Sequence, residues 1–244
     1  MLNVHSIETF WTQDWPWIRL VIFLQWCMFR CKYCHNPDTI PFENEAAMHW
    51  NENDILDRLA KEAEYFWKDW WVTFSWWEPL FQAPALLPVV RKIKEAGYHV
   101  CIDTNWFVQS EEAREILKLA DLILPDIKHI DSDKCKDLVG QSNENTLKTL
   151  DYLDEIKKPY RLRQVIVPGY TDDEFDLRKL WEYIKTRTSM ERLELLPYHN
   201  MWVSKREKLK WDYPLKGVPA ATTDDLKRVK AILDEYSDKI YMRG

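Results

Sequence analysis

Short apolar runs alternate along the chain with segments of helical periodicity. The residues of these runs are mainly apolar or β-branched, which is typical of buried strands. They lie at residues 18–24, 72–74, 100–102, 122–124, 162–167 and 193–196. Each run is followed by a segment that carries the pattern of an amphipathic helix. The sequence therefore predicts six β/α units in series.

The helical segments are recognised by apolar residues that recur every three or four positions. Their apolar faces carry Ile55, Leu56, Leu59, Ala60, Ala63 and Phe66; Leu87, Val90 and Ile93; Ile116, Leu117 and Ala120; Leu147, Leu150, Leu153 and Ile156; and Leu226, Val229, Ile232 and Leu233. Gly97 is expected to cap the second helix. A capping-box pattern at 171–174 opens a helix between the last two strands. Six such units predict an α/β fold with parallel strands and helices outside, in a single domain over residues 1–244.

Length and charge narrow the class of protein. The chain has 244 residues, and single α/β barrels reach that length. Its net charge of −6 is mild and evenly spread, so neither nucleic acid nor a polybasic membrane site is expected. The N-terminus lacks a basic segment followed by a long apolar one, and no run of about 18 apolar residues occurs. We expect a cytoplasmic protein without membrane contact.

The glycine and tryptophan contents are abnormal. Glycine averages about 7% of residues in ordinary proteins, which would be roughly 17 here. The chain has 5 Gly and 14 Trp. The glycine deficit and the tryptophan excess are of similar size, which suggests that many tryptophans stand where such a chain uses glycine.

Three cysteines, Cys27, Cys31 and Cys34, lie on one loop after the first predicted strand. In an α/β fold the working residues lie after the carboxyl ends of the strands. Three thiolates suit a four-iron four-sulfur cluster with one iron left open. Zinc held by the same cysteines and His35 is an alternative, and Cys31 to His35 also matches a haem-attachment pattern. Cys101 and Cys135 are expected to be ordinary thiols, one in the core and one in a loop.

Further polar motifs follow the other strands in order. They are Ser-Trp-Trp-Glu-Pro at 75–79, Asp-Thr-Asn at 103–105, Asp-Ile-Lys at 126–128 and Leu-Leu-Pro-Tyr-His at 195–199. Together with Cys-x3-Cys-x2-Cys, this order resembles the radical S-adenosylmethionine enzymes, and most closely the pyruvate formate-lyase activating enzymes. The resemblance spans nearly the whole chain. It implies a partial (β/α)6 barrel of radical S-adenosylmethionine type.

The resemblance also implies a chemistry. A reduced four-iron four-sulfur cluster on Cys27, Cys31 and Cys34 would cleave S-adenosylmethionine, and the resulting radical would take a hydrogen from a backbone glycine of pyruvate formate-lyase. The expected electron source is a low-potential one-electron donor such as flavodoxin or ferredoxin. The enzyme is expected to be a monomer.

The resemblance assigns roles to individual residues. The residues that it implies at the cofactor are Ser75, Trp76, Trp77, Glu78, Asp103, Asp126, Lys128, Arg163 and His199. Asp103, Thr104 and Asp126 would surround a monovalent cation, and Asp14 and Arg19 would contact the glycine-bearing loop of the partner. Each residue also has an ordinary structural interpretation: Asp103 and Asp126 as caps, Lys128 as a surface lysine, His199 as a hydrogen-bonded histidine and Arg163 as the partner of a carboxylate.

The tryptophans interrupt this pattern at its glycines. The family has glycine where this chain has Trp11, Trp15, Trp17, Trp26, Trp70, Trp71, Trp76, Trp77 and Trp106, and the same is expected for Trp67 and Trp202. Glycine serves where φ is positive or where backbone approaches a ligand closely. Two indoles at 76–77 would fill the volume of the cofactor. The sequence therefore predicts impaired or absent turnover, with a cluster-binding protein without turnover, or an altered non-functional sequence, as the alternatives.

Overall fold

The structure is a computed structural model, and it describes residues 1–11, 19–34, 36–41, 47–62, 71–75, 78–105, 110–201, 203, 206, 209–234 and 237–243. The chain divides into two units. Unit 1 comprises residues 1–28 and 39–124, and unit 2 comprises residues 29–38 and 125–244. A single domain over the whole chain stays a prediction.

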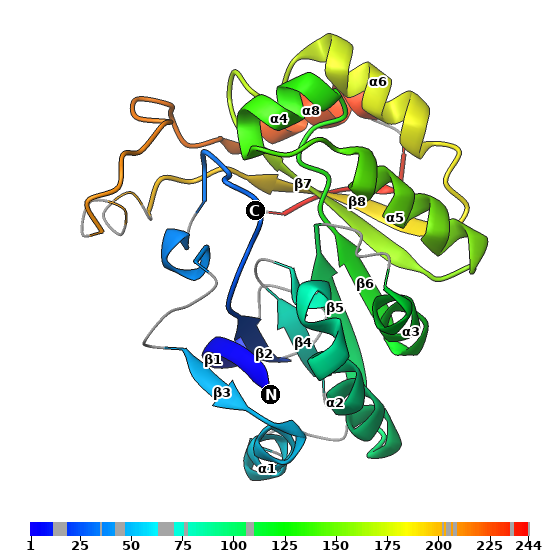
Figure 1. The fold of residues 1–244 in the computed structure, drawn as a ribbon. Coiled ribbons are helices and arrows are strands. Elements are labelled where there is room, and N and C mark those ends of the chain that lie inside the picture. The colour runs from blue at the N-terminus through cyan, green and yellow to red at the C-terminus, as the bar shows by residue number, and fades with distance from the viewer. Residues whose placement is uncertain are drawn as a thin grey trace. The chain divides into compact units, whose positions relative to one another are not determined.

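Unit 1 is built on a sheet whose strand order is β3-β1-β2-β4-β5-β6 (Figure 1). Its strands are β1 (Leu2–Trp11), β2 (Arg19–Leu24), β3 (Met48–Trp50), β4 (Trp71–Ser75), β5 (His99–Thr104) and β6 (Leu122–Pro125). β2, β4 and β5 pair in parallel, whereas β1 pairs antiparallel with both β2 and β3. All six residues of β2 are buried, including Arg19, and the other five form a continuous apolar run of the kind that a parallel sheet buries.

Three helices accompany these strands. They are α1 (Glu52–Glu62), α2 (Ala83–Glu95) and α3 (Glu111–Leu119), and α2 packs against both of the others. Two short 3-10 helices, η1 (Pro37–Thr39) and η2 (Pro79–Gln82), precede α2 in the chain. The predicted cap of α2 is confirmed: Gly97 has a φ of 83°, and the N–H of Tyr98 donates to the carbonyl oxygen of Ile93.

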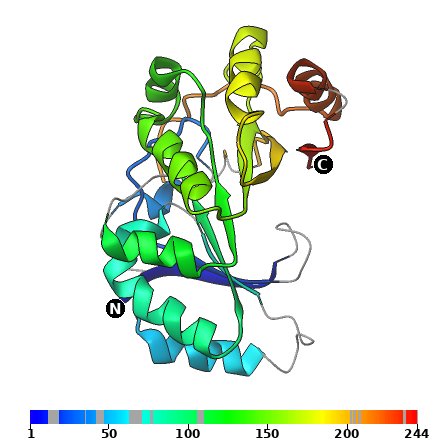
Figure 2. The same cartoon turned by 90° about the vertical axis from the view of Figure 1, so that its right-hand side faces the viewer.

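Unit 2 continues the alternation of strands and helices. It contains α4 (Ser132–Val139), α5 (Glu144–Glu155), β7 (Tyr160–Ile166), α6 (Glu174–Ile184), β8 (Met190–Pro197), α8 (Thr223–Asp234) and β9 (Ile240–Met242). β8 pairs in parallel with both β7 and β9. The α6 helix packs against α8, and Figures 1 and 2 show the two helices side by side. No helix in the described part of the chain is long and apolar enough to cross a membrane.

The predicted α/β fold class, with a mostly parallel sheet and helices, is confirmed. The six predicted strands correspond to β2, β4, β5, β6, β7 and β8. The apolar pattern did not indicate β1, β3, β9 or α4. The helix expected to open with a capping box at 171–174 begins at Glu174, and its cap is Asp173, whose side chain accepts from the N–H of Asp176.

Candidate active site

The cysteine loop follows β2 and crosses from unit 1 into unit 2. Cys27 belongs to unit 1, whereas Cys31 and Cys34 belong to unit 2, and all three are buried. Among the described residues, no group of three His, Cys, Asp or Glu side chains could hold one metal ion. The convergence of the three cysteines on one cluster therefore stays a prediction. His35, the fourth ligand of the zinc alternative, lies outside the described residues.

The surroundings of Cys31 and Cys34 fit thiolate ligands of a cluster. Burial raises the pKa of the Cys31 thiol to about 11 in the metal-free chain, and the Lys128 charge opposes that rise. Burial also raises the pKa of Cys34, while the charges of Arg206 and Lys128 lower it. Two cations thus face thiols that a metal centre would deprotonate. Soft thiolates beside buried cations are a donor set suited to an anionic iron-sulfur group.

Asp126 and Lys128 form an ion pair in the loop after β6. Lys128 Nζ lies 2.5 Å from Asp126 Oδ2, and the residue is 8% exposed. Burial lowers the pKa of Lys128, but Asp126, Tyr33 and Cys31 together more than compensate and hold that pKa well above its ordinary value. The ammonium group also lies 5.9 Å from the centre of the Tyr33 ring. Lys128 is therefore a buried cation beside the cysteine loop, not a solvated surface lysine.

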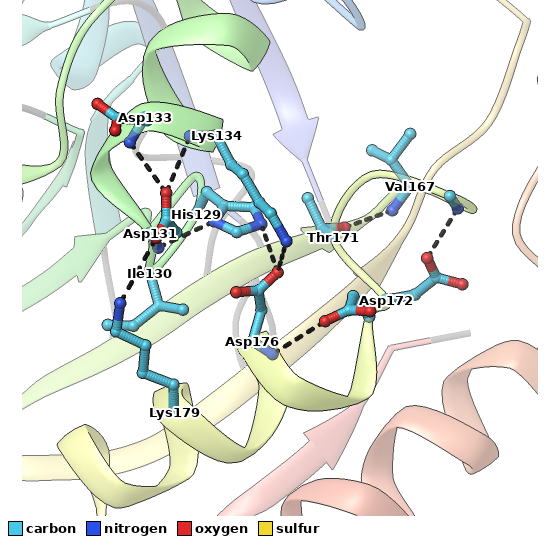
Figure 3. Close-up of polar contacts among 12 residues, drawn as sticks. His129, Ile130, Asp131, Asp133, Lys134, Val167, Thr171, Asp172, Asp176 and Lys179 are labelled. Atoms are coloured by element: carbon cyan, nitrogen blue, oxygen red, sulfur yellow. Dashed lines mark hydrogen bonds and ion pairs between the residues drawn. The ribbon is translucent and has the colours of Figure 1, made fainter.

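The next residues of this loop are fixed to the start of α6 (Figure 3). His129 Nδ1 accepts from the backbone N–H of Asp131, and His129 Nε2 lies 3.7 Å from Asp176 Oδ2. Lys134 donates to the same carboxylate oxygen. Burial lowers the pKa of His129 even though Asp176 favours its charged form. A neutral ring protonated at Nε2 accounts for both contacts. These contacts of His129 with Asp131 and Asp176, called the histidine lock below, attach the segment that carries Asp126 and Lys128 to the start of α6.

Unit 1 contributes the predicted cofactor residues after β4 and β5. The Ser75 hydroxyl donates to Asp103 Oδ2 at 2.8 Å. The Glu78 carboxylate is buried and accepts from the Thr104 hydroxyl at 2.8 Å and from the N–H of Asn105 at 3.0 Å. Trp76 and Trp77, which lie between Ser75 and Glu78, are outside the described residues. The structure thus brings the two loop ends of this unit together by hydrogen bonds.

Arg163 and His199 were both predicted at the cofactor. Arg163 Nε lies 3.3 Å from Glu194 Oε2, across the paired strands β7 and β8. Its ion pair with Glu194 is the structural role, pairing with a carboxylate, that was expected for Arg163. His199 is half-buried, and burial lowers the pKa of its imidazole. A contact of either side chain with the cofactor stays a prediction.

Arg19, one of the two predicted partner-binding residues, is the first residue of β2. Asp14 is outside the described residues. Arg19 is 0% exposed, its Nη1 donates to the Thr73 hydroxyl at 3.1 Å, and its guanidinium lies 5.1 Å from the centre of the Trp71 ring. The role of Arg19 toward a partner stays a prediction.

The sequence missed several residues that organise the site. Cys101 is a core thiol as expected, but the loop assignment of Cys135 is wrong, because Cys135 is buried in α4, a helix capped by Asp131 and Gly140. His129, Glu194 and Arg206 were not singled out. A glutamate inside the apolar strand β8 was a local signal, whereas nothing near Arg206 pointed to the cysteine loop.

Comparison with known proteins identifies relatives of the chain. The Radical SAM superfamily model matches residues 21–179. A pyruvate formate-lyase-activating enzyme of Streptococcus mutans is 38% identical over 253 residues, covering 97% of this chain and 94% of that protein. An enzyme of the same name from Staphylococcus aureus is 38% identical, covering 92% of each chain.

Solved structures share the fold. A domain of the pyruvate-formate lyase-activating enzyme of Bacteroides vulgatus matches with a TM-score of 0.58 and 23% identity, covering 71% of this chain and 98% of that one. Streptococcus suis SuiB bound to its precursor peptide SuiA matches with a TM-score of 0.68 and 17% identity, covering 90% of this chain and 47% of that one. The chain belongs to the radical S-adenosylmethionine superfamily, and within it to the family of pyruvate formate-lyase-activating enzymes, whose cofactors are a four-iron four-sulfur cluster and S-adenosylmethionine.

Proposed function

We propose that the chain descends from enzymes that activate pyruvate formate-lyase and that its chemistry is that of this family. The observation that carries the proposal is 38% identity over 97% of the chain to a relative of that name. The chemistry supplied by a bound cluster is one-electron reduction of S-adenosylmethionine, whose cleavage yields the radical that takes hydrogen from a backbone glycine of pyruvate formate-lyase. A low-potential donor such as flavodoxin or ferredoxin supplies the electron, and the enzyme works as a monomer.

In this proposal, residues of unit 2 bind the cluster and orient S-adenosylmethionine. Cys31 and Cys34, with Cys27, would hold the cluster. Lys128, a buried cation, would bind the carboxylate of S-adenosylmethionine, and His199 would bind its adenosyl group. Asp126 Oδ1 is available to a monovalent cation, because this buried oxygen has no hydrogen-bond partner in the described part of the chain.

Unit 1 supplies the cofactor loop of the proposal. The Ser75–Asp103 and Glu78–Thr104 hydrogen bonds fix the two ends of that loop. Trp76 and Trp77 stand between those ends, at positions where the family has glycine. We propose that the two indoles occupy volume that the cofactor needs, so that the sequence as it stands retains a cluster but has weak or absent turnover.

Reconstitution separates the possibilities. The chain is loaded anaerobically with iron and sulfide, reduced, and examined by electron paramagnetic resonance with and without S-adenosylmethionine, in parallel with a Trp76→Gly/Trp77→Gly variant. The proposal expects a cluster signal in both chains, a change on adding the cofactor only in the variant, and 5′-deoxyadenosine only from the variant. Turnover by the parent would contradict the impairment, and no cluster in either chain would contradict the family chemistry.

A further inference from the structure

Arg206 reaches from the segment after β8 to the loop that carries two predicted cluster ligands. Its Nη2 donates to the carbonyl oxygen of Cys31 at 3.0 Å, and its Nε donates to the carbonyl oxygen of Cys34 at 3.5 Å. Nη1 donates to the carbonyl oxygen of Asp212 at 3.0 Å. The residue is 7% exposed, and all of these contacts lie within unit 2. One buried guanidinium thus holds both ends of the Cys31–Cys34 turn.

Backbone N–H groups also restrain this turn. Backbone N–H groups of residues 30 and 32 donate to the carbonyl oxygens of Val139 and Leu138, at the end of α4. The N–H of Cys34 donates to the carbonyl oxygen of Cys31 at 3.0 Å. The charged guanidinium of Arg206 donates to carbonyl oxygens of the same turn. Without them, the buried carbonyl of Cys34 would lose the donor that compensates its removal from water.

Charge adds a second reason for a cation at this place. Iron-bound thiolates are anionic, and hydrogen bonds and charge around the sulfurs tune such centres. We propose that Arg206 is a positioning residue that orients the Cys31 and Cys34 ligands and compensates their charge in the loaded protein. This proposal rests on the proposed function, because it presumes that these two cysteines hold the cluster.

The first test measures how firmly iron is held. Arg206→Met, Arg206→Lys and the surface control Arg178→Met are loaded with iron and sulfide and titrated with an iron chelator. Loss of a residue that orients metal ligands lowers metal affinity by about 10- to 100-fold, so Arg206→Met is expected to release iron at correspondingly lower chelator concentration. Arg206→Lys keeps the positive charge but lacks the several N–H donors of the guanidinium, so its iron retention is expected to lie between those of Arg206→Met and the parent. Iron retention by Arg206→Met equal to that of the control would overturn the proposal.

The second test needs no iron. Hydrogen exchange of the peptide around residues 31–34 is followed in the iron-free parent and in the same variants. Faster exchange in Arg206→Met, with the parental rate in Arg178→Met, supports the clamp; parental exchange in Arg206→Met contradicts it. If the parent assembles no cluster, the proposed function fails, while this measurement still decides whether Arg206 holds the turn.

An independent observation concerns the backbone at residue 26. Trp26 has a φ of 87°, within the 78° to 90° of the described glycines. The other described non-glycine residues with positive φ, Lys157 and Lys210, have 54° and 56°, the ordinary left-handed values. For a bulky residue a φ near 87° is an outlier, whereas glycine adopts it freely. Position 26 therefore has the backbone of a glycine.

Residue 71 is crowded in a different way. The centroid of the Trp71 ring lies 3.3 Å from that of the His99 ring. Paired aromatic rings normally have centroids about 4.5–7 Å apart. By contrast, Trp50, Trp181 and Trp211 are absent from the described residues with positive φ. Two tryptophans thus sit in places that suit a much smaller residue, in a chain with 5 Gly and 14 Trp.

We infer that residues 26 and 71 are glycine in the protein that the source cell makes, because the codon written as tryptophan at these positions is decoded there as glycine. The test is mass spectrometry of tryptic peptides from protein purified from that cell. Peptides 20–30 and 69–91 are expected to carry the mass of glycine at residues 26 and 71. Peptide 180–185, which contains Trp181, is the control and is expected to keep tryptophan. Tryptophan masses at 26 and 71 would overturn the inference.

Discussion

The two units use similar elements but differ in how well their residues suit their positions. In unit 2, Gly140 and Gly169 occupy positions with a φ of 78°, and the buried Glu194 is surrounded by arginines. In unit 1, the left-handed position 26 holds a tryptophan, and Arg19 is buried with two guanidinium nitrogens unpartnered among the described residues. Of the eleven tryptophans predicted to stand at family glycines, ten fall within the sequence ranges of unit 1 and one, Trp202, falls within that of unit 2. We predict from this difference that tryptophan stands in place of glycine mainly in the unit 1 segments whose backbone freedom a cofactor loop needs.

The largest expected effect tests the completed charge network of unit 2. Glu194 is 0% exposed and lies 3.3 Å from Arg163, 2.7 Å from Arg192 and 3.0 Å from Arg243. Burial raises the pKa of this carboxyl, but the arginines more than compensate and lower it. Glu194→Gln leaves buried cations without their counter-charge and is expected to cost about 3–5 kcal/mol. Denaturant unfolding measures the loss.

Glu174→Gln is the matched control, because Glu174 lies on the exposed side of α6 and its side chain is 61% exposed. Its ion pair with Arg178 is expected to contribute less than about 1 kcal/mol. Equal losses in the two variants would mean that the buried network stabilises unit 2 no more than a surface pair does.

The next effect tests the glycine-like backbone in unit 1. Trp26→Gly and Trp26→Ala both remove the contact of the indole with Phe81, but only glycine adopts a φ of 87° without strain. The glycine variant is therefore expected to be more stable than the alanine variant by about 1–2 kcal/mol. Thermal and denaturant unfolding of the pair give this difference directly.

Trp50 in strand β3 provides the reverse expectation. Extended backbone suits alanine, so Trp50→Ala is expected to be more stable than Trp50→Gly by about 0.5–1 kcal/mol. If glycine and alanine rank in the same order at positions 26 and 50, the left-handed backbone of residue 26 does not determine its preference.

Much of the fold could be predicted because the parallel strands contain short apolar runs. The six residues of β2 are all buried, and the sequence identifies such a strand without any partner information. β1 was missed because its apolar and polar residues follow no clear alternation, and β3 because three residues are too few for a pattern. α4 has only eight residues. Short or edge elements depend on their neighbours, which a local pattern does not contain.

The site was predictable where its residues share a motif. Cys31 and Cys34 are three positions apart, and Asp126 and Lys128 are two apart, so one loop brings each pair together. Arg206 is 175 positions from Cys31 in the chain and meets it only through the fold. Its contact is with backbone carbonyls, which every residue type has, so the sequence holds no complementary side chain that could indicate the pair.

A smaller effect is expected for Arg19 of unit 1, only part of whose guanidinium is hydrogen-bonded among the described residues. Arg19 donates to Thr73 and lies over Trp71, while Nε and Nη2 have no hydrogen-bond partner in the described part of the chain. Replacing a buried charge that lacks compensation with an apolar side chain of similar length is often neutral or stabilising. Arg19→Met is expected to change the free energy of unfolding by less than about 1 kcal/mol, or to raise it. A loss as large as that of Glu194→Gln would show that Arg19 is fully compensated.

The last expected effect concerns the histidine lock of unit 2. Burial lowers the pKa of His129, whose ring faces Asp176 Oδ2 with Lys134 beside it and accepts from the N–H of Asp131. Because the folded pKa lies below the ordinary value of 6.5, the unfolded chain takes up the proton first. The contribution of neutral His129 is therefore present above that pH and is lost as the pH falls toward the folded pKa. Unfolding measured from pH 7.5 to 5 is expected to show a smaller loss in His129→Gln than in the parent, with His49→Gln on the exposed side of β3 as the control. If the free energy of unfolding varies with pH in the same way in the parent and in His129→Gln, protonation of His129 is not linked to folding.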